Sequence, residues 1–208
     1  LFNVGVLSIA KQIVLTVDLP LNDHIETNYD DLNENRENNI DTHEHRYESQ
    51  LIKLVEGWNL VSIYVELDDN SPGAVFNHSY IVEVKDMMSS YNPTLPANFN
   101  TLTEIVPGKG YFVKCSSDAN IEIKGESIKQ KSLVMSEGWN LLGSGAVGTV
   151  PVTKFTDNKD EINMIIGSGD GVWDKTLPSE FNSLNTLKNG KAYFVNSSQD
   201  SLWIINNE

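Results

Sequence analysis

An internal duplication constrains the fold of this 208-residue chain more than any other feature of its sequence. A Gly-Trp-Asn-Leu segment at 57–60 recurs at 138–141, an offset of 81 residues (138 − 57 = 81). Further along, the segment at 108–113 recurs with one change at 190–195, an offset of 82 (190 − 108 = 82). Because the order of the matches is kept and the offset changes by one residue, the chain contains two copies of one structural unit.

The duplication defines the domain organisation. The first unit covers residues 50–125 and the second covers residues 131–208. Each unit is near the lower end of the size at which a domain is stable by itself. The units are therefore either two small domains or the two halves of one pseudo-symmetric domain. Since residues 126–130 form a short link, we expect the units to lie against each other.

The pattern within each unit indicates an all-β fold. Short apolar or alternating runs are separated by Gly, Pro, Asn, Asp and Ser, which is typical of strands joined by turns. We expect about five antiparallel strands per unit, arranged as a small sandwich or barrel. The runs lie at 51–55, 60–65, 80–84, 110–114 and 120–123, and at 133–135, 139–142, 164–166, 192–195 and 202–205.

Two other local features are predicted in each unit. The first strand ends at a glycine, Gly57 or Gly138, which favours a tight hairpin with a residue in the left-handed region. A short helical segment is expected after Pro72, with 74–76 facing the core, and its equivalent lies at 152–155.

Residues 1–19 precede the duplicated part and have the composition of a strand-forming arm. Ile13, Leu15, Val17 and Leu19 alternate with other residues along this arm, which is the pattern of a β-strand. Two interpretations stay open: the arm pairs with a sheet edge of a neighbouring subunit, or it adds a strand to the first unit.

Residues 20–49 form an acidic, Asn-rich segment that we interpret as a solvated linker. Much of the net charge of −14 lies there, from 29 acidic and 15 basic residues in the whole chain. Such acidity argues against a nucleic-acid-binding protein and against binding to anionic lipid. No apolar run reaches the roughly 18 residues of a membrane span.

The repeat resembles a β module found in marine phage structural proteins and in bacterial surface or secreted proteins. The resemblance covers about residues 50–208 and rests on the Gly-Trp-Asn-Leu opening, a Val-Lys-Asp segment at 84–86, Phe99-Asn100, and Pro-Gly-Lys-Gly-Tyr-Phe-Val-Lys at 107–114. The second unit lacks the Val-Lys-Asp triplet and has Ala192 in place of the second glycine. The resemblance implies a non-catalytic module of an exported or virion-associated protein, and no active-site residues come with it.

The polar motifs provide little support for catalysis, and no cofactor is expected. Cys115 is the single cysteine, so neither an intrachain disulfide nor a cysteine-based zinc cluster is expected. His43 and His45 lack a third metal ligand at a typical spacing, and the acids of 68–70 and 157–161 are expected to form solvated turns rather than a calcium site. The glycine-rich segment 167–171 is followed by a predicted strand, which favours a hairpin over a phosphate-binding loop.

The aromatic residues are the best binding candidates. Trp58 and Trp139 occupy equivalent positions beside a glycine, and we expect them to anchor the two small cores. Tyr91 and Trp173 are also equivalent and lie among turn-forming residues. They either lie exposed, where they could stack on a sugar or contact a partner protein, or pack beneath the long loop.

These observations support two functional hypotheses. The first is a non-catalytic structural or assembly protein on the exterior of a virion or another large extracellular assembly, attached to neighbouring subunits by its N-terminal arm. The alternative is a recognition module on a cell surface or fibre that binds glycan or protein through Tyr91 and Trp173.

Overall fold

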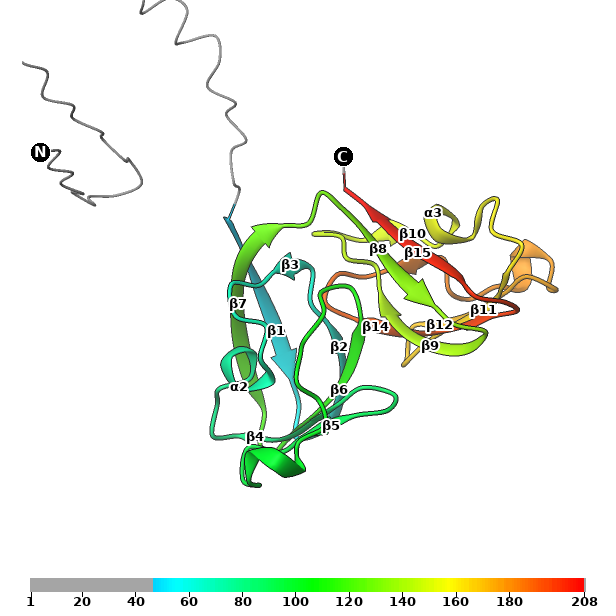
Figure 1. Cartoon of the computed structure of the whole chain (residues 1–208). Coiled ribbons are helices and arrows are strands. Elements are labelled where there is room, and N and C mark those ends of the chain that lie inside the picture. Colours follow the sequence, from blue (N-terminus) through cyan, green and yellow to red (C-terminus); the bar gives the residue numbers. More distant parts are fainter. Residues whose placement is uncertain (1–46, 208) are drawn as a thin grey trace, which may run out of the picture. The chain divides into compact units, whose positions relative to one another are not determined.

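The computed structural model describes residues 47–207, which contain both copies of the duplicated unit (Figure 1). Repeat 1 (residues 47–127) comprises β1 (Tyr47–Leu54), β2 (Gly57–Ser62), β3 (Val65–Glu66), α2 (Pro72–Val75), β4 (Ile81–Lys85), β5 (Ser90–Tyr91), the 3-10 turn η1 (Ala97–Phe99), β6 (Gly110–Cys115) and β7 (Ala119–Ser127). Repeat 2 (residues 130–207) comprises β8 (Gln130–Met135), β9 (Gly138–Gly143), β10 (Val150–Pro151), α3 (Thr153–Thr156), β11 (Ile162–Gly167), β12 (Gly171–Asp174), the 3-10 turn η2 (Ser179–Phe181), β13 (Thr186–Leu187), β14 (Ala192–Ser197) and β15 (Ser201–Asn206).

Each repeat is built from two main antiparallel sheets, which confirms the predicted all-β class. In repeat 1 the strand orders are β1-β7-β3 and β2-β6-β4-β5. In repeat 2 the equivalent orders are β8-β15 and β9-β14-β11-β12, and β10 and β13 form a separate pair. The sheets remain open, so the fold is sandwich-like and no barrel closes among the described residues.

For the glycine turn after the first strand, the left-handed backbone conformation was predicted correctly, but the prediction that the turn closes a hairpin was wrong. Gly57 and Gly138 have φ angles of +92° and +90°, the left-handed region that glycine adopts without a steric penalty. However, β1 pairs with β7 while β2 pairs with β6. The turn therefore carries the chain from one sheet to the other instead of closing a hairpin.

The asparagine of the Gly-Trp-Asn-Leu segment fixes this corner. The Asn59 side chain accepts a hydrogen bond from Val55 N at 2.9 Å and donates one to Val55 O at 2.8 Å. Asn140 makes the same two bonds to Ser136, at 2.9 and 2.8 Å. These bonds satisfy backbone groups at the point where the chain leaves one sheet and enters the next. The segment is therefore a corner motif.

Each repeat has its own hydrophobic core. Val75 and Phe76 at α2 are buried in the first core, and Phe155 of α3 is buried in the second, as predicted. Ala74, which was also predicted to face the core, is exposed. The second core also contains Trp203, which is 1% exposed, stacks on Phe155 with ring centroids 4.3 Å apart, and donates its indole N–H to Gly143 O at 2.8 Å.

The observed element bounds differ slightly from the predicted boundaries. Because β1 starts at Tyr47 and pairs along its whole length with β7, residues 47–49 of the predicted linker belong to repeat 1. The strand β7 ends at Ser127 and β8 begins at Gln130, so the link between the repeats is shorter than predicted. Most of the predicted linker and the whole arm, including Ile13, Leu15, Val17 and Leu19, lie outside the described residues.

Reciprocal backbone contacts join the two repeats. Val61 forms an antiparallel bridge with Lys191, and Leu142 forms the equivalent bridge with Lys109. Two hydrogen bonds accompany these bridges, from Ser62 N to Gly190 O at 2.9 Å and from Gly143 N to Gly108 O at 2.8 Å. Because each residue on one side has its repeat equivalent on the other, the junction has the form of a pseudo-two-fold interface.

Close approach at this junction requires a small residue. A Cβ atom added to Gly110 would lie 2.6 Å from Ala192 Cβ, and Gly110 and Ala192 are themselves repeat equivalents (192 − 110 = 82). A larger residue at either position would therefore push the two sheets apart.

Candidate binding surface

Trp58 and Trp139 lie on the surface, so the prediction that they anchor the cores was wrong. Their side chains are 47% and 46% exposed. Side chains alternate between the two faces of a strand, and in β2 Val61 is buried while Trp58 is exposed. With Asn59 at the sheet corner and Val61 in the core, Trp58 is left on the outer face, and β9 repeats the arrangement.

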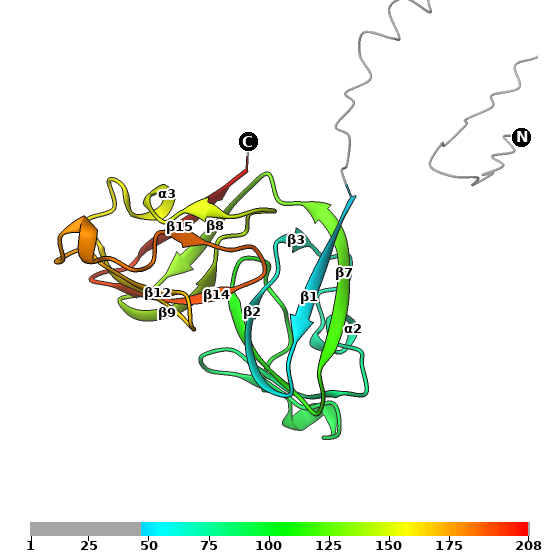
Figure 2. The same cartoon turned by 180° about the vertical axis from the view of Figure 1, so that it is seen from behind.

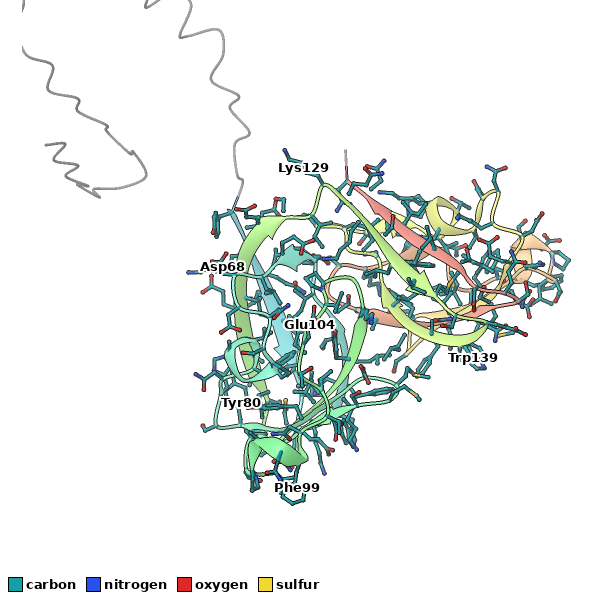
Figure 3. All side chains as sticks on the ribbon, in the orientation of Figure 1. Asp68, Tyr80, Phe99, Glu104, Lys129 and Trp139 are labelled. Carbon is teal, nitrogen blue, oxygen red and sulfur yellow. The ribbon has the colours of Figure 1, made fainter. Side chains whose placement is uncertain are left out.

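The two tryptophans are the ends of a continuous row of aromatic rings. Trp58 packs edge-on against Phe112, with ring centroids 6.5 Å apart. Phe112 contacts its own repeat equivalent, Phe194, at 6.0 Å, and Phe194 packs edge-on against Trp139 at 6.5 Å. We call these four residues the central aromatic surface. Figure 3 labels Trp139 on β9.

A groove lies beside each tryptophan, and the other repeat completes it. Groove A has a volume of about 500 Å³ and combines β1 and Trp58 with residues 189–192 and Ser168 of repeat 2. Groove B has a volume of about 420 Å³ and combines Trp139 and its strand with residues 86–88 and 109–110 of repeat 1. Both grooves therefore depend on the reciprocal junction.

The Trp58 end of the surface is cationic. Lys85 Nζ and Lys114 Nζ lie over the Trp58 ring, 5.2 and 5.6 Å from its centroid, which is within the range of cation–π attraction. Lys85 is also paired with Glu83 at 3.0 Å. Lys53 and Lys191 line groove A beside this end, although Lys191 is paired with Asp170 at 2.7 Å.

The Trp139 end is apolar. An open pocket of about 340 Å³ is lined by Met87, Trp139, Ile166 and Phe194. The next residue, Met88, is 94% exposed and lines groove B. This end therefore presents a hollow with no charged side chain in its lining, and the indole N–H of Trp139 is the one conventional hydrogen-bonding side-chain group there.

The difference between the ends has two sources, strand substitutions and the turns that follow β4 and β11. Lys85 pairs with Phe112 as Ile166 pairs with Phe194, so Ile166 takes the place of Lys85 at the Trp139 end. In the same way Asn196 takes the place of Lys114.

The repeat offset rises from 81 to 82 within the turns that follow β4 and β11, so the second turn has one extra residue. The first turn carries Met87 and Met88, whereas the second carries Asp170, which is bonded to Lys188 at 2.5 Å and to Lys191 at 2.7 Å. Burial raises the pKa of Asp170, but the hydrogen bonds from the two lysines outweigh burial and lower its pKa overall.

Tyr91 and Trp173, the predicted contact residues, lie away from the central aromatic surface. Tyr91 is on β5 opposite Val84, and Trp173 is on β12 opposite Ile165. Both are half-buried, and each packs against the core of its own repeat. This placement favours the packing interpretation over the exposed one.

The other polar motifs take structural positions. The glycine-rich segment forms the predicted hairpin, with Gly167 paired to Gly171. Cys115 is a buried free thiol whose pKa is raised by burial, and His78 stacks on Tyr80 at 5.0 Å. Within residues 47–207, no three His, Cys, Asp or Glu side chains are grouped as metal ligands. Among the same residues, no helix has the length and apolar character of a membrane span.

A sequence signal for the central aromatic surface was present. The alternation along 58–61 places Trp58 and Val61 on opposite faces. Phe112 and Phe194 alternate with the buried neighbours Tyr111 and Val113, and Tyr193 and Val195. Their convergence across the junction depends on contacts between distant parts of the chain, which no local pattern records.

Comparisons of the sequence with protein-family models and with curated proteins, and of the structure with solved structures, gave no match.

Proposed function

We propose that this chain is a non-catalytic recognition module that binds a protein partner on its central aromatic surface. The observation that carries the proposal is the exposure of the equivalent tryptophans Trp58 and Trp139 at both ends of one aromatic row. Leaving two tryptophans half in water forgoes the stability that burying them would provide. Their occurrence in both repeats is explained when a partner covers them.

The lining of the surface favours a protein over a glycan. Tryptophan, phenylalanine and methionine are enriched in the cores of protein interfaces. The pocket at the Trp139 end is formed by Met87, Trp139, Ile166 and Phe194. The Trp139 indole N–H could bond one sugar hydroxyl, but the other hydroxyl groups would lack partners there, whereas an apolar protein side chain would fill the pocket.

The positive charge at the Trp58 end adds a second requirement for the partner, namely acidic side chains. Lys85 and Lys114 flank the Trp58 ring, in a chain whose net charge is −14. We therefore infer a partner segment with an apolar or aromatic anchor for the Trp139 pocket and acidic residues toward Trp58. Raising the salt concentration would weaken the acidic contacts and leave the apolar one.

The setting of this activity follows from the resemblance of the repeat to phage structural and bacterial surface modules. We propose that the chain belongs to a virion or another extracellular assembly, as a structural subunit rather than an enzyme. Attachment through the N-terminal arm remains a separate proposal, because residues 1–46 lie outside the described part of the chain.

A random linear peptide library displayed on phage and panned against the full chain tests the binding proposal. We expect enrichment of peptides with an aromatic or aliphatic anchor and acidic residues, and loss of their binding to the Trp58→Ala and Trp139→Ala variants. Leu202→Ala is the control, because Leu202 has the same 46% exposure as Trp139 but lies on β15.

Two outcomes would contradict the proposal. The first is enrichment of peptides that bind both tryptophan variants as well as the wild-type chain. The second is an absence of enriched peptides together with tryptophan-dependent binding on a glycan array, which would assign the surface to sugar recognition.

A further inference from the structure

Two loops present apolar side chains to solvent at equivalent positions in the repeats. In repeat 1, Leu95 and Phe99 are 48% and 64% exposed, and in repeat 2, Leu177 and Phe181 are 46% and 69% exposed. The phenylalanines are the last residues of η1 and η2. Figure 3 labels Phe99 at the outer end of repeat 1. In Figures 1 and 2, the orange segment with η2 lies on the side of repeat 2 away from repeat 1.

Hydrogen bonds hold the loop of repeat 2 in one conformation. The Asp174 side chain accepts from Thr176 N at 2.8 Å and from Thr176 Oγ1 at 2.7 Å. Asn182 closes the loop by accepting from Asp174 N at 2.6 Å and donating to Asp174 O at 3.3 Å. The turn itself is held by Phe181 N, which donates to Pro178 O at 2.9 Å.

The loop of repeat 1 repeats these bonds with Asn92 in the place of Asp174. Asn92 accepts from Thr94 N at 2.9 Å, and Asn100 closes the loop with a 2.8 Å bond from Asn92 N. Both loops are therefore preorganised, so a partner that binds them would lose little conformational entropy in ordering them. An apolar tip held rigidly in water is suited to insertion into an apolar pocket.

The molecule also contains such a pocket, at the Trp139 end of the central aromatic surface. Its volume of about 340 Å³ exceeds the cavity of about 150 Å³ that holds benzene in another protein, so a phenyl ring fits. Lys109 lies in groove B, which shares Met87 and Trp139 with the pocket. The groove also contains Asp86, whose carboxylate accepts hydrogen bonds from Met88 N and Ser89 N of its own turn. Its repeat equivalent, Lys191, is neutralised by Asp170, whereas the shorter turn of repeat 1 carries methionines in the corresponding region.

We propose that Phe181 of one copy of the chain inserts into the pocket formed by Met87, Trp139, Ile166 and Phe194 of a second copy. The residue before it distinguishes Phe181 from Phe99: Glu180 supplies a negative charge for Lys109, whereas Asn98 supplies none. This inference rests on the proposed function, because it identifies the protein partner of the same surface.

The contact joins two different patches of the same chain, so a single contact makes a head-to-tail pair, whereas two reciprocal contacts would close a symmetric dimer. After one contact forms, one Phe181 loop and one pocket remain free, and further copies can add to either end. A structural subunit of an extended assembly requires this property.

Light scattering after size exclusion, on the full chain over a range of concentrations, tests the inference. We expect the average mass of the wild-type chain to rise with concentration. Phe181→Ala and Trp139→Ala each weaken association by about 30-fold or more, as expected when a central interface anchor is lost. Met87→Glu is a second pocket variant, which places a charge in the pocket without removing core volume. Phe99→Ala and Leu202→Ala are the controls and associate like the wild-type chain.

Mixing variants provides the sharper test. Phe181→Ala retains an intact pocket and Trp139→Ala retains an intact loop, so an equimolar mixture forms a one-to-one dimer although neither variant assembles alone. A wild-type chain that stays monomeric at every concentration overturns the inference, as does association that persists in both variants. If library peptides still require Trp139 in that case, the proposed function stands and only the identity of the partner is wrong.

Discussion

The two turns that follow β4 and β11 show how one duplicated unit produced two different binding ends. Each turn lies beside the groove of the other repeat, so a change in one turn alters the surroundings of the tryptophan in the other repeat. The turn of repeat 1 contributes Met87 to an apolar pocket beside Trp139. The turn of repeat 2 contributes Ser168 to groove A and directs Asp170 to Lys188 and Lys191. The turns therefore shape the two grooves differently, and the replacement of Lys85 and Lys114 by Ile166 and Asn196 separates the cationic end from the apolar end.

The largest expected effect is the difference in unfolding free energy between losing a buried tryptophan and losing an exposed one. Trp203→Ala removes a side chain that is 1% exposed and stacked on Phe155, and it should lower the free energy of unfolding by about 3–5 kcal/mol. Trp139→Ala removes one edge-on ring contact and should cost about 1 kcal/mol. Urea denaturation measures both values, and equal losses would place Trp139 in the core and contradict the description of the surface.

The second effect concerns the stability that Asp170 provides in the turn of repeat 2. Asp170→Asn removes the charge that accepts hydrogen bonds from Lys188 and Lys191, and should lower the free energy of unfolding by about 2 kcal/mol at neutral pH. Because the folded-state pKa of Asp170 is lowered, its contribution is present above the usual aspartate pKa of about 3.9 and is lost as the pH falls through the folded-state pKa.

The difference between wild type and Asp170→Asn should therefore shrink below about pH 4. Denaturation curves measured at a series of pH values check this, and the exposed Asp157 provides the control through Asp157→Asn. A difference that stays constant into the acid range would show that charge is not the source of the stabilisation.

The third effect should be the same in both repeats. Gly57→Ala and Gly138→Ala place a Cβ at φ angles of +92° and +90°, with no atom within 4 Å of the added carbon. The cost is therefore conformational, about 1–2 kcal/mol in each case. Unequal losses of unfolding free energy would indicate that the two corners are not equivalent.

The smallest effect concerns the cationic end. The double variant Lys85→Ala and Lys114→Ala removes both ammonium groups over Trp58 and should lower the free energy of unfolding by about 0.5–1 kcal/mol. Added salt should reduce the difference. No change in stability at low salt would mean that the lysines do not stabilise Trp58, and their role would then be limited to the partner.

Local patterns in the sequence were sufficient for the longer strands, the two helical segments and the duplication, but not for the two-residue strands β3, β5, β10 and β13. They failed at Trp58, because a large aromatic residue beside a glycine is typical of a core anchor. Which face of the sheet its side chain occupies depends on the corner that the Asn59 hydrogen bonds fix. Local patterns also failed at Gly57, since a left-handed glycine is compatible with a hairpin and with a corner between sheets. The pairing of Val61 with Lys191 joins residues far apart in the chain, so neither the central aromatic surface nor its grooves could be assembled from local periodicity.

The indole N–H resonances of the four tryptophans test the central claim most directly. A two-dimensional nitrogen–proton spectrum of the full chain is recorded while a peptide selected from the library is added. We predict that the Trp58 and Trp139 resonances shift, while that of Trp203, whose indole N–H is buried and bonded to Gly143 O, does not. Shifts confined to Trp173 or Trp203, with Trp58 and Trp139 unchanged, would contradict this prediction.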